Sequence, residues 1–167
     1  MKVRKGREED FIRLDWGWYK DYPTQNMFIN KLHIDVLEFW VVEEEGIEDL
    51  LGEFHIIWNS PDKDEADGNE RVYLCVFRVH PGYRGKGIGK ALKDVVFERL
   101  REEGKKEATI GVKKDLLDLK KMYLNWGFTS FIKNKKIDHH NVDEEGNYKK
   151  TAIPIQIYLK NLDSCKD

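Results

Sequence analysis

Hydrophobic and polar residues follow two different periods along the chain, and together they predict a mixed α and β fold. Six short runs are apolar or alternate with period two, which is typical of buried or half-buried strands. These runs are Glu38–Val42, Leu51–Trp58, Val72–Val79, Ala108–Val112, Phe128–Ile132 and Ile153–Leu159. Pro154 lies early in the last run, where a missing backbone donor matters least, or else it marks a sheet edge.

Helical periodicity lies between the predicted strands. Lys90–Arg101 gathers its apolar residues on one stripe at a spacing near 3.6 and its charges on the opposite face, and Gly104 is a suitable stop. A second helix is predicted from Asp115, a good N-cap residue, to Trp126, immediately before Gly127. Weaker helical patterns cover two further segments, Glu8–Tyr19 and Met27–Leu37.

Length and composition restrict the class of protein. The chain has 167 residues, and we expect residues 1–167 to form a single domain. The chain is 40% hydrophobic and 36% charged, with a formal net charge of −2, which indicates a globular protein without broad attraction to nucleic acid. We expect no signal peptide, because no apolar segment follows the charged segment Met1 to Lys5, and no apolar stretch approaches the roughly 20 residues of a membrane span. We therefore expect a cytoplasmic protein with no membrane partner.

Two cysteines are too few for a disulfide framework. Cys75 lies within the apolar run Val72–Val79 and is expected to be buried and reduced. Cys165 is close to the C-terminus and is expected to be exposed. This usage is typical of a reducing compartment.

A glycine-rich loop between a predicted strand and a predicted helix is the most informative segment. The strand Val72–Val79 ends just before it, and the sequence Arg84-Gly85-Lys86-Gly87-Ile88-Gly89 leads into the helix that begins near Lys90. This order places unpaired backbone N–H groups at a helix N-terminus, which binds anions. Glycines let the backbone approach the ligand closely, and the neighbouring cationic side chains add positive charge.

Three nucleotide-binding patterns compete for this loop. A P-loop requires G-x-x-x-x-G-K followed by Ser or Thr, but the present loop is one residue too short and Ala91 follows its lysine. A dinucleotide fingerprint requires G-x-G-x-x-G, whereas Gly85 to Gly89 reads G-x-G-x-G. The third pattern, Gln or Arg followed by x-x-G-x and then Gly or Ala, matches Arg84, Gly87 and Gly89.

This third pattern resembles the acyl-CoA pyrophosphate loop of the GNAT superfamily of N-acetyltransferases. The likeness extends over Val79-x-Pro81-x-Tyr83-Arg84, and Met122-Tyr123-Leu124-Asn125-Trp126-Gly127-Phe128 resembles the second family signature, L-Y-x-x-x-G-F. The segment Val3 to Asp10 is similar to the usual first strand and first helix. The resemblance therefore covers essentially the whole chain, most strongly from Val72 to Phe128.

The resemblance implies a fold and an activity. The fold is α/β (α+β), with a mixed, mostly antiparallel sheet of about six to seven strands and about four helices. The activity is transfer of an acetyl group from acetyl-CoA to a primary amine, with no metal. The fourth and fifth strands splay around the pantetheine arm. The implied CoA-binding residues are Phe77, Val79, Arg84, Gly85, Lys86, Gly87, Ile88, Gly89, Lys90 and Asn125.

Tyr123 matches the family's usual general acid, although its spacing also suits an apolar helix face. The general base stays open, because the family position that holds a Glu is Tyr73 here. Candidates are Glu53, His55, Glu70 and His80, and a water chain could also serve. A second departure is Leu116, where the family commonly has a CoA-binding Asn; Asn125 or Asp115 could replace it.

The acceptor is less well defined. The charged segments Asn59–Glu70 and Asp138–Lys150 are predicted to be solvated loops. Three acidic clusters would suit a cationic acceptor, namely Glu43 to Glu45, Asp62 to Asp67 and Asp143 to Glu145. The first helical region holds four aromatic residues, Trp16, Trp18, Tyr19 and Tyr22. We interpret them as core or interface residues rather than as the lining of an amine pocket.

Three questions remain open at the level of sequence. The pair His139-His140 lacks partners at metal-ligand spacing and is interpreted as loop. The residues do not decide between a monomer and a homodimer. Two alternatives to the enzyme remain, a non-catalytic acyl-CoA sensor and an ATP-binding regulator. The absent P-loop Lys-Ser/Thr pair argues against the regulator.

Overall fold

The computed structural model describes residues 1–162, which are built around one seven-stranded sheet. Its order is β1-β2-β3-β4-β5-β7-β6, and every neighbouring pair is antiparallel except β4 and β5, which are parallel. The strands are β1 (Lys2–Lys5), β2 (Leu37–Glu43), β3 (Gly52–Ile57), β4 (Arg71–Val79), β5 (Glu107–Lys113), β6 (Ser130–Val142) and β7 (Tyr148–Asn161). The predicted mixed, mostly antiparallel sheet is confirmed.

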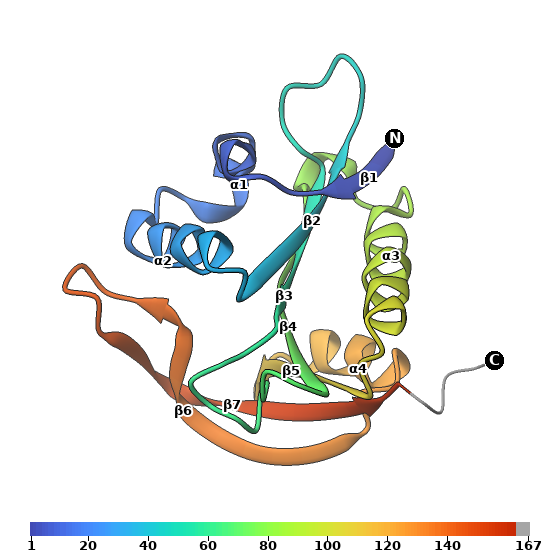
Figure 1. The fold of residues 1–167 in the computed structure, drawn as a ribbon. Coiled ribbons are helices and arrows are strands. Elements are labelled where there is room, and N and C mark those ends of the chain that lie inside the picture. Colours follow the sequence, from blue (N-terminus) through green and yellow to red (C-terminus); the bar gives the residue numbers. More distant parts are fainter. Residues whose placement is uncertain (163–167) are drawn as a thin grey trace.

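Helices cover both faces of this sheet (Figure 1). The α-helices are α1 (Asp15–Trp18), α2 (Tyr22–His33), α3 (Ile88–Glu102) and α4 (Leu117–Asn125), and the 3-10 helices are η1 (Glu8–Leu14) and η2 (Pro81–Tyr83). The first two α-helices lie on one side and α3 and α4 on the other. Each side buries its own hydrophobic core, with Phe28 and Phe39 at the centre of one and Phe54 and Leu92 at the centre of the other.

The predicted solvated loop Asp138–Lys150 is wrong, because most of it belongs to the long hairpin of β6 and β7. The hairpin reaches the side of the molecule that carries α2 (Figure 1). Polar residues fill the outer part of the hairpin, so the alternation of apolar and polar residues stops before the two strands end. Opposite charges stabilise the pairing there, as in Asp138 opposite Lys149. The register slips between Lys135 and Ile137, opposite the stretch that contains Pro154, which has no ladder donor.

The N-terminal helical region is more broken than its periodicity predicts. Residues 8–19 form a 3-10 helix and one short α-helix, which ends where Tyr19 and Lys20 adopt left-handed φ angles of 50° and 60°. Helix α2 begins earlier than predicted, because the carboxylate of Asp21 caps it by accepting from the backbone N–H of Thr24. Asp115 is not the N-cap of α4; that position is Leu116.

The parallel strands β4 and β5 separate as the family resemblance implies. They pair only from Arg71 to Leu74 and from Glu107 to Ile110, although both strands continue further. Beyond this point the β5-facing edge of β4 has no strand partner, and a gap opens between the two strands. Backbone groups on that edge are available to a ligand.

Other local expectations have mixed outcomes. Asn59–Glu70 is a loop, closed by an isolated bridge between Asn59 and Asp67. Cys75 is unpaired but half-buried rather than buried, and burial raises the pKa of its thiol. Cys165 lies outside the described residues. Across residues 1–162, no helix has both the length and the apolar character that a bilayer crossing requires.

Candidate active site

A cleft of about 860 Å³ lies beside the end of β4 that has no β5 partner. Its walls come from the end of β4, the glycine-rich loop, the first turn of α3, and residues of α1 and α4. Of the ten predicted CoA-binding residues, eight line it: Phe77, Val79, Arg84, Gly85, Gly87, Ile88, Gly89 and Lys90. Lys86 and Asn125 do not line the cleft and are exposed, so their role stays a prediction.

The backbone of the glycine-rich loop forms the surface of the cleft. Gly85 and Gly87 have φ angles of 79° and 80°, and a Cβ built on either would meet no atom within 4 Å. A side chain there would therefore project into open space beside the cleft rather than into the core. Gly87 is the N-cap of α3, and the first helical bond runs from the N–H of Ala91 to its carbonyl, 3.0 Å away. The preceding N–H groups are left for an anion.

Positive charge surrounds this helix N-terminus. Arg84 is exposed and makes no ion pair within residues 1–162. Lys90 donates to Asp94 one turn later at 2.7 Å, and the Lys93 ammonium lies 5.8 Å from the centre of the Trp126 ring. Unpaired N–H groups, the helix dipole and these cations suit a pyrophosphate.

The inner wall of the cleft is apolar. The ring of Phe77 packs against those of Phe54 and Trp126, with centroids 4.9 and 5.1 Å away. Gly89 allows this ring to approach, because a Cβ on it would lie 3.0 Å from the Phe77 Cζ atom. Leu119 and Met122 of α4 complete the wall. The cleft therefore combines an anion site with an apolar channel, as a nucleotide joined to a thioester arm requires.

Tyr123 borders this wall through its contact with Trp126 but is not among the residues that line the cleft. Residues of the same helix line the cleft, whereas Tyr123 is 6% exposed and packs beside Trp126 and Phe128. Its hydroxyl makes no hydrogen bond to another residue of the described chain. Burial raises the pKa of the phenol, and the Coulombic effect of Cys75 on β4 raises it further. A phenol in this setting stays protonated at neutral pH and can act only as an acid.

The four candidate bases lie in different surroundings. Glu70 pairs with Lys106 on the surface, away from the cleft, and His80 donates towards Asp49 while its Nδ1 accepts from the N–H of Gly82. His55 is fully buried, and desolvation lowers its pKa despite the Glu53 carboxylate 2.7 Å away.

Glu53 is the candidate beside the site. Its carboxylate accepts from the indole N–H of Trp18 at 3.2 Å and lies 3.5 Å from the guanidinium of Arg78. Arg78 lines the cleft, and sequence reasoning missed it. The only signal was a charged residue within the apolar run Val72–Val79.

The aromatic residues of the N-terminal region divide between core and site. Trp18 is 4% exposed and belongs to the core, as expected. Trp16 and Tyr19 line the cleft, whereas Tyr22 is exposed and lines no part of it.

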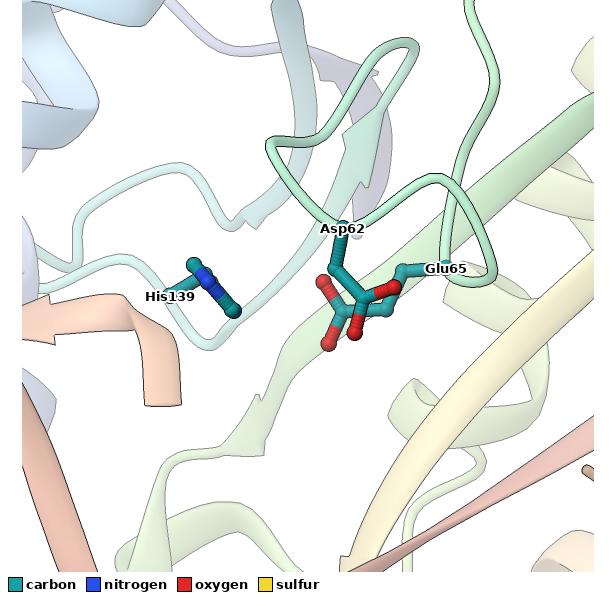
Figure 2. A group of neighbouring side chains, drawn as sticks. All are labelled: Asp62, Glu65 and His139. Carbon is teal, nitrogen blue, oxygen red and sulfur yellow. The ribbon is translucent and has the colours of Figure 1, made fainter. Parts of the chain in front are cut away.

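A group of three metal-type ligands lies outside the cleft. Asp62, Glu65 and His139 bring one ligand atom each within 4.8 Å of one another, and their side chains converge from two segments (Figure 2). The ammonium of Lys135 is already there, 2.7 Å from Asp62, 2.9 Å from Glu65 and 2.9 Å from the Nδ1 atom of His139. His140 donates to Glu65 at 2.8 Å. The group thus joins the loop 59–70 to β6 through a cation that the chain supplies.

Comparisons with known proteins agree with this geometry. The acetyltransferase (GNAT) family matches residues 7–128, and the chain belongs to this family. Among curated proteins no sequence matches.

Solved structures of low sequence identity share the fold. A ribosomal-protein-alanine N-acetyltransferase from Brucella melitensis is 18% identical, with a TM-score of 0.68, and the alignment covers 96% of this chain and 99% of that one. The yncA protein of Salmonella typhimurium, solved with acetyl-CoA, is 18% identical over 98% of this chain and 94% of its own, with a TM-score of 0.65. A GNAT acetyltransferase from Elizabethkingia anophelis, also with acetyl-CoA bound, is 14% identical over 96% and 97%, with a TM-score of 0.64.

Proposed function

We propose that the protein is an N-acetyltransferase that moves the acetyl group of acetyl-CoA to a primary amine. The observation that carries the proposal is the junction of two features in one cleft: the end of β4 beyond its pairing with β5, and the glycine-rich N-terminus of α3. The first accommodates an extended thioester arm, and the second binds a pyrophosphate. In the transfer, a C–N amide bond forms, the C–S bond of the thioester breaks, and the free thiol and one proton are released.

The cleft residues would hold acetyl-CoA, which supplies the activated acetyl group. Backbone N–H groups of the loop and the Arg84 side chain bind the diphosphate, and the unpaired edge of β4 near Phe77 and Val79 holds the arm and polarises the thioester carbonyl. Holding both reactants in line contributes much of the rate. Tyr123 would donate the proton that the departing sulfur needs, since its raised pKa keeps it protonated.

The amine would arrive from the other face of the sheet. A second pocket of about 240 Å³ lies there between α1, α2, β4 and β6. The acidic clusters predicted from the sequence do not line it: Asp62 pairs with Lys133 and Lys135, and Glu43 pairs with Arg4 and Arg13. Support for a cationic acceptor comes instead from Asp21 and Asp138, whose carboxylates line this pocket.

Calorimetric titration tests the co-substrate, and thiol release tests the transfer. We expect saturable binding of acetyl-CoA but not of ATP or NAD, followed by amine-dependent release of CoA. Binding without turnover of any amine would favour a non-catalytic acyl-CoA sensor. Binding of ATP in preference to acetyl-CoA would contradict both functions.

A further inference from the structure

Arg78 lies where two cavities meet. The first is the cleft formed by the end of β4, the glycine-rich loop and α4, and the second is the pocket between α1, α2, β4 and β6. Among the residues that the structure describes, Arg78 alone lines both. If acetyl-CoA occupies the first cavity and the acceptor the second, as proposed above, their reacting groups meet beside this side chain. The chemical group that Arg78 can bind therefore limits which class of amine can serve as the acceptor.

A backbone irregularity directs Arg78 to the acceptor side. Val76 has a φ of 52°, which is strained for a β-branched residue. Here the register shifts so that Cys75 pairs with His55 and Arg78 with Glu53, which leaves one extra residue on β4. Directly paired residues share a face of the sheet, so the bulge puts Arg78 on the same face as Glu53. Without it, the alternation of β4 would turn Arg78 to the opposite face.

The surroundings hold Arg78 in place. Glu53 is fully buried and lies 3.5 Å from the Nη1 atom of Arg78, and the guanidinium stacks 4.8 Å from the centre of the Trp18 ring. Gly17 leaves room for the side chain, because a Cβ there would lie 3.0 Å from the Arg78 Cδ atom. A guanidinium packed on three sides is pre-organised for a ligand on the fourth.

The guanidinium of Arg78 has an ion-pair partner in Glu53 but makes no hydrogen bond within residues 1–162. Its Nη1 atom is buried and makes no hydrogen bond, and the 3.5 Å to Glu53 exceeds a good hydrogen-bond length. The Nε and Nη2 atoms of the side chain also make no hydrogen bond within residues 1–162. A guanidinium offers five donors in a planar fork that matches a carboxylate. The side chain is 35% exposed, so the donors that do not face Glu53 are open to a second anionic partner.

The rest of the inner pocket has the opposite charge. Asp138 accepts from the N–H of His140 with Oδ1, and Asp21 accepts from Thr24 with Oδ1. Neither carboxylate forms an ion pair within the described part of the chain. Trp18 and Phe28 add apolar surface to this pocket. The second pocket thus offers one cation that also lines the cleft and two anions that do not.

We propose that the acceptor is an α-amino acid whose carboxylate binds Arg78 and whose side chain carries hydrogen-bond donors or a positive charge. Binding of the carboxylate at Arg78 places the neighbouring α-amine at the meeting point of the two cavities. The amine nitrogen then forms the amide bond as the thioester C–S bond breaks, and its proton leaves to solvent. Asp21 and Asp138 receive the donors of the side chain. The inference rests on the proposed acetyl transfer.

The test compares amines that differ only in the carboxylate. Thiol release is measured with lysine against cadaverine, with arginine against agmatine, and with each amino acid against its amide. A site with unpaired donors should favour the carboxylate-bearing member by about 10²-fold or more in kcat/KM. Equal or faster turnover of the decarboxylated amines would overturn the inference, although it would leave the proposed acetyl transfer intact.

Two variants assign the preference to Arg78. Arg78→Lys keeps the charge but loses the planar fork, and the double variant Glu53→Gln/Arg78→Gln removes the buried pair without leaving one charge alone. The ratio of rates within each pair of amines cancels any loss of folded protein. We expect the ratio to approach one in both variants. An unchanged ratio would contradict the role of Arg78.

A binding measurement decides the inference even without turnover. In the presence of CoA, N-acetyl-lysine carrying its carboxylate is titrated against N-acetyl-cadaverine, which lacks it. Tighter binding of the carboxylate form, lost in Arg78→Lys, supports the inference, and equal binding rejects it. If no amine is acetylated, the proposed transfer fails, whereas this titration still reports on the pocket.

Discussion

Gly87 and Gly104 lie beyond opposite ends of α3, and both adopt the left-handed conformation, with φ angles of 80° and 69°. Neither would place a Cβ within 4 Å of another atom. They differ in surroundings: Gly87 lines the cleft, and Gly104 does not. The two residues therefore separate the conformational role of a glycine from its role in ligand binding.

We expect Gly87→Ala and Gly104→Ala to have similar effects on stability and different effects on binding. Each forces an alanine into a left-handed conformation, which costs roughly 1–2 kcal/mol of unfolding free energy. Only Gly87→Ala also disturbs the anion site, and its affinity for acetyl-CoA should fall at least roughly tenfold, about 1.4 kcal/mol. Urea unfolding and calorimetry measure the two effects. Equal affinities of the two variants for acetyl-CoA would show that the loop is not part of the binding site.

Tyr123→Phe should lower kcat with little change in acetyl-CoA affinity, because a general acid acts on the chemical step. Loss of such an acid costs roughly 10²–10⁴-fold. Tyr158→Phe is the matched control, since Tyr158 is also nearly buried, at 8% exposed against 6% for Tyr123. A comparable loss of kcat in both variants would indicate a packing effect.

The pH profile adds a second test of Tyr123. Burial raises the pKa of this phenol above its usual value near 10, so the acid form persists as the pH rises. We expect kcat of the wild type, measured with saturating amine, to show no decline assignable to Tyr123 below about pH 10. A decline near neutral pH that disappears in Tyr123→Phe would contradict the raised pKa.

Glu65 should make the protein sensitive to acid. Burial opposes its ionisation, but the hydrogen bond from His140 and the ammonium of Lys135 outweigh burial and lower its pKa to about 2. Since the folded pKa lies below the unfolded value of about 4.3, the contribution is fully present above that value and is lost as the pH falls towards 2. At neutral pH, this contribution of Glu65 to the free energy of unfolding amounts to about 3 kcal/mol.

Glu65→Gln should therefore lower the unfolding free energy at pH 7. It should also make this free energy less dependent on pH between about pH 5 and 2. Urea unfolding across this range measures the change. Glu144→Gln, at an exposed turn residue, serves as the control. If both variants keep the slope of the wild type, Glu65 is not the group responsible.

Lys135 should compete with metal ions at the Asp62, Glu65 and His139 group. Its ammonium is within 2.9 Å of all three side chains, so a divalent cation would have to displace it. We expect Zn²⁺ to leave the Tm of the wild type unchanged and to raise the Tm of Lys135→Met. The rise should disappear when His139→Gln is added. A Zn²⁺-dependent Tm in the wild type, lost in His139→Gln, would instead identify a natural metal site.

The sequence by itself determined the strand, loop and helix around Arg84 to Gly89. The pattern is local: a strand that ends, glycines that permit left-handed backbone, and an amphipathic helix whose first turn is unpaired. Eight of the ten predicted binding residues line the cleft for this reason. The sheet type followed from the family resemblance rather than from periodicity. Residues 138–150 were missed because the outer part of a two-stranded hairpin carries no apolar face.

Only the tertiary structure decided how Arg78 is used. From the sequence it is one charged residue in an apolar strand, and alternation would place it without regard to Glu53. The bulge at Val76 reverses that placement, and the partner Glu53 lies on another strand, 25 positions earlier in the chain. Likewise, Lys135 reaches Asp62 and Glu65 across 73 and 70 positions. Contacts of this kind depend on strand register and on long-range packing, which neighbouring residues do not encode.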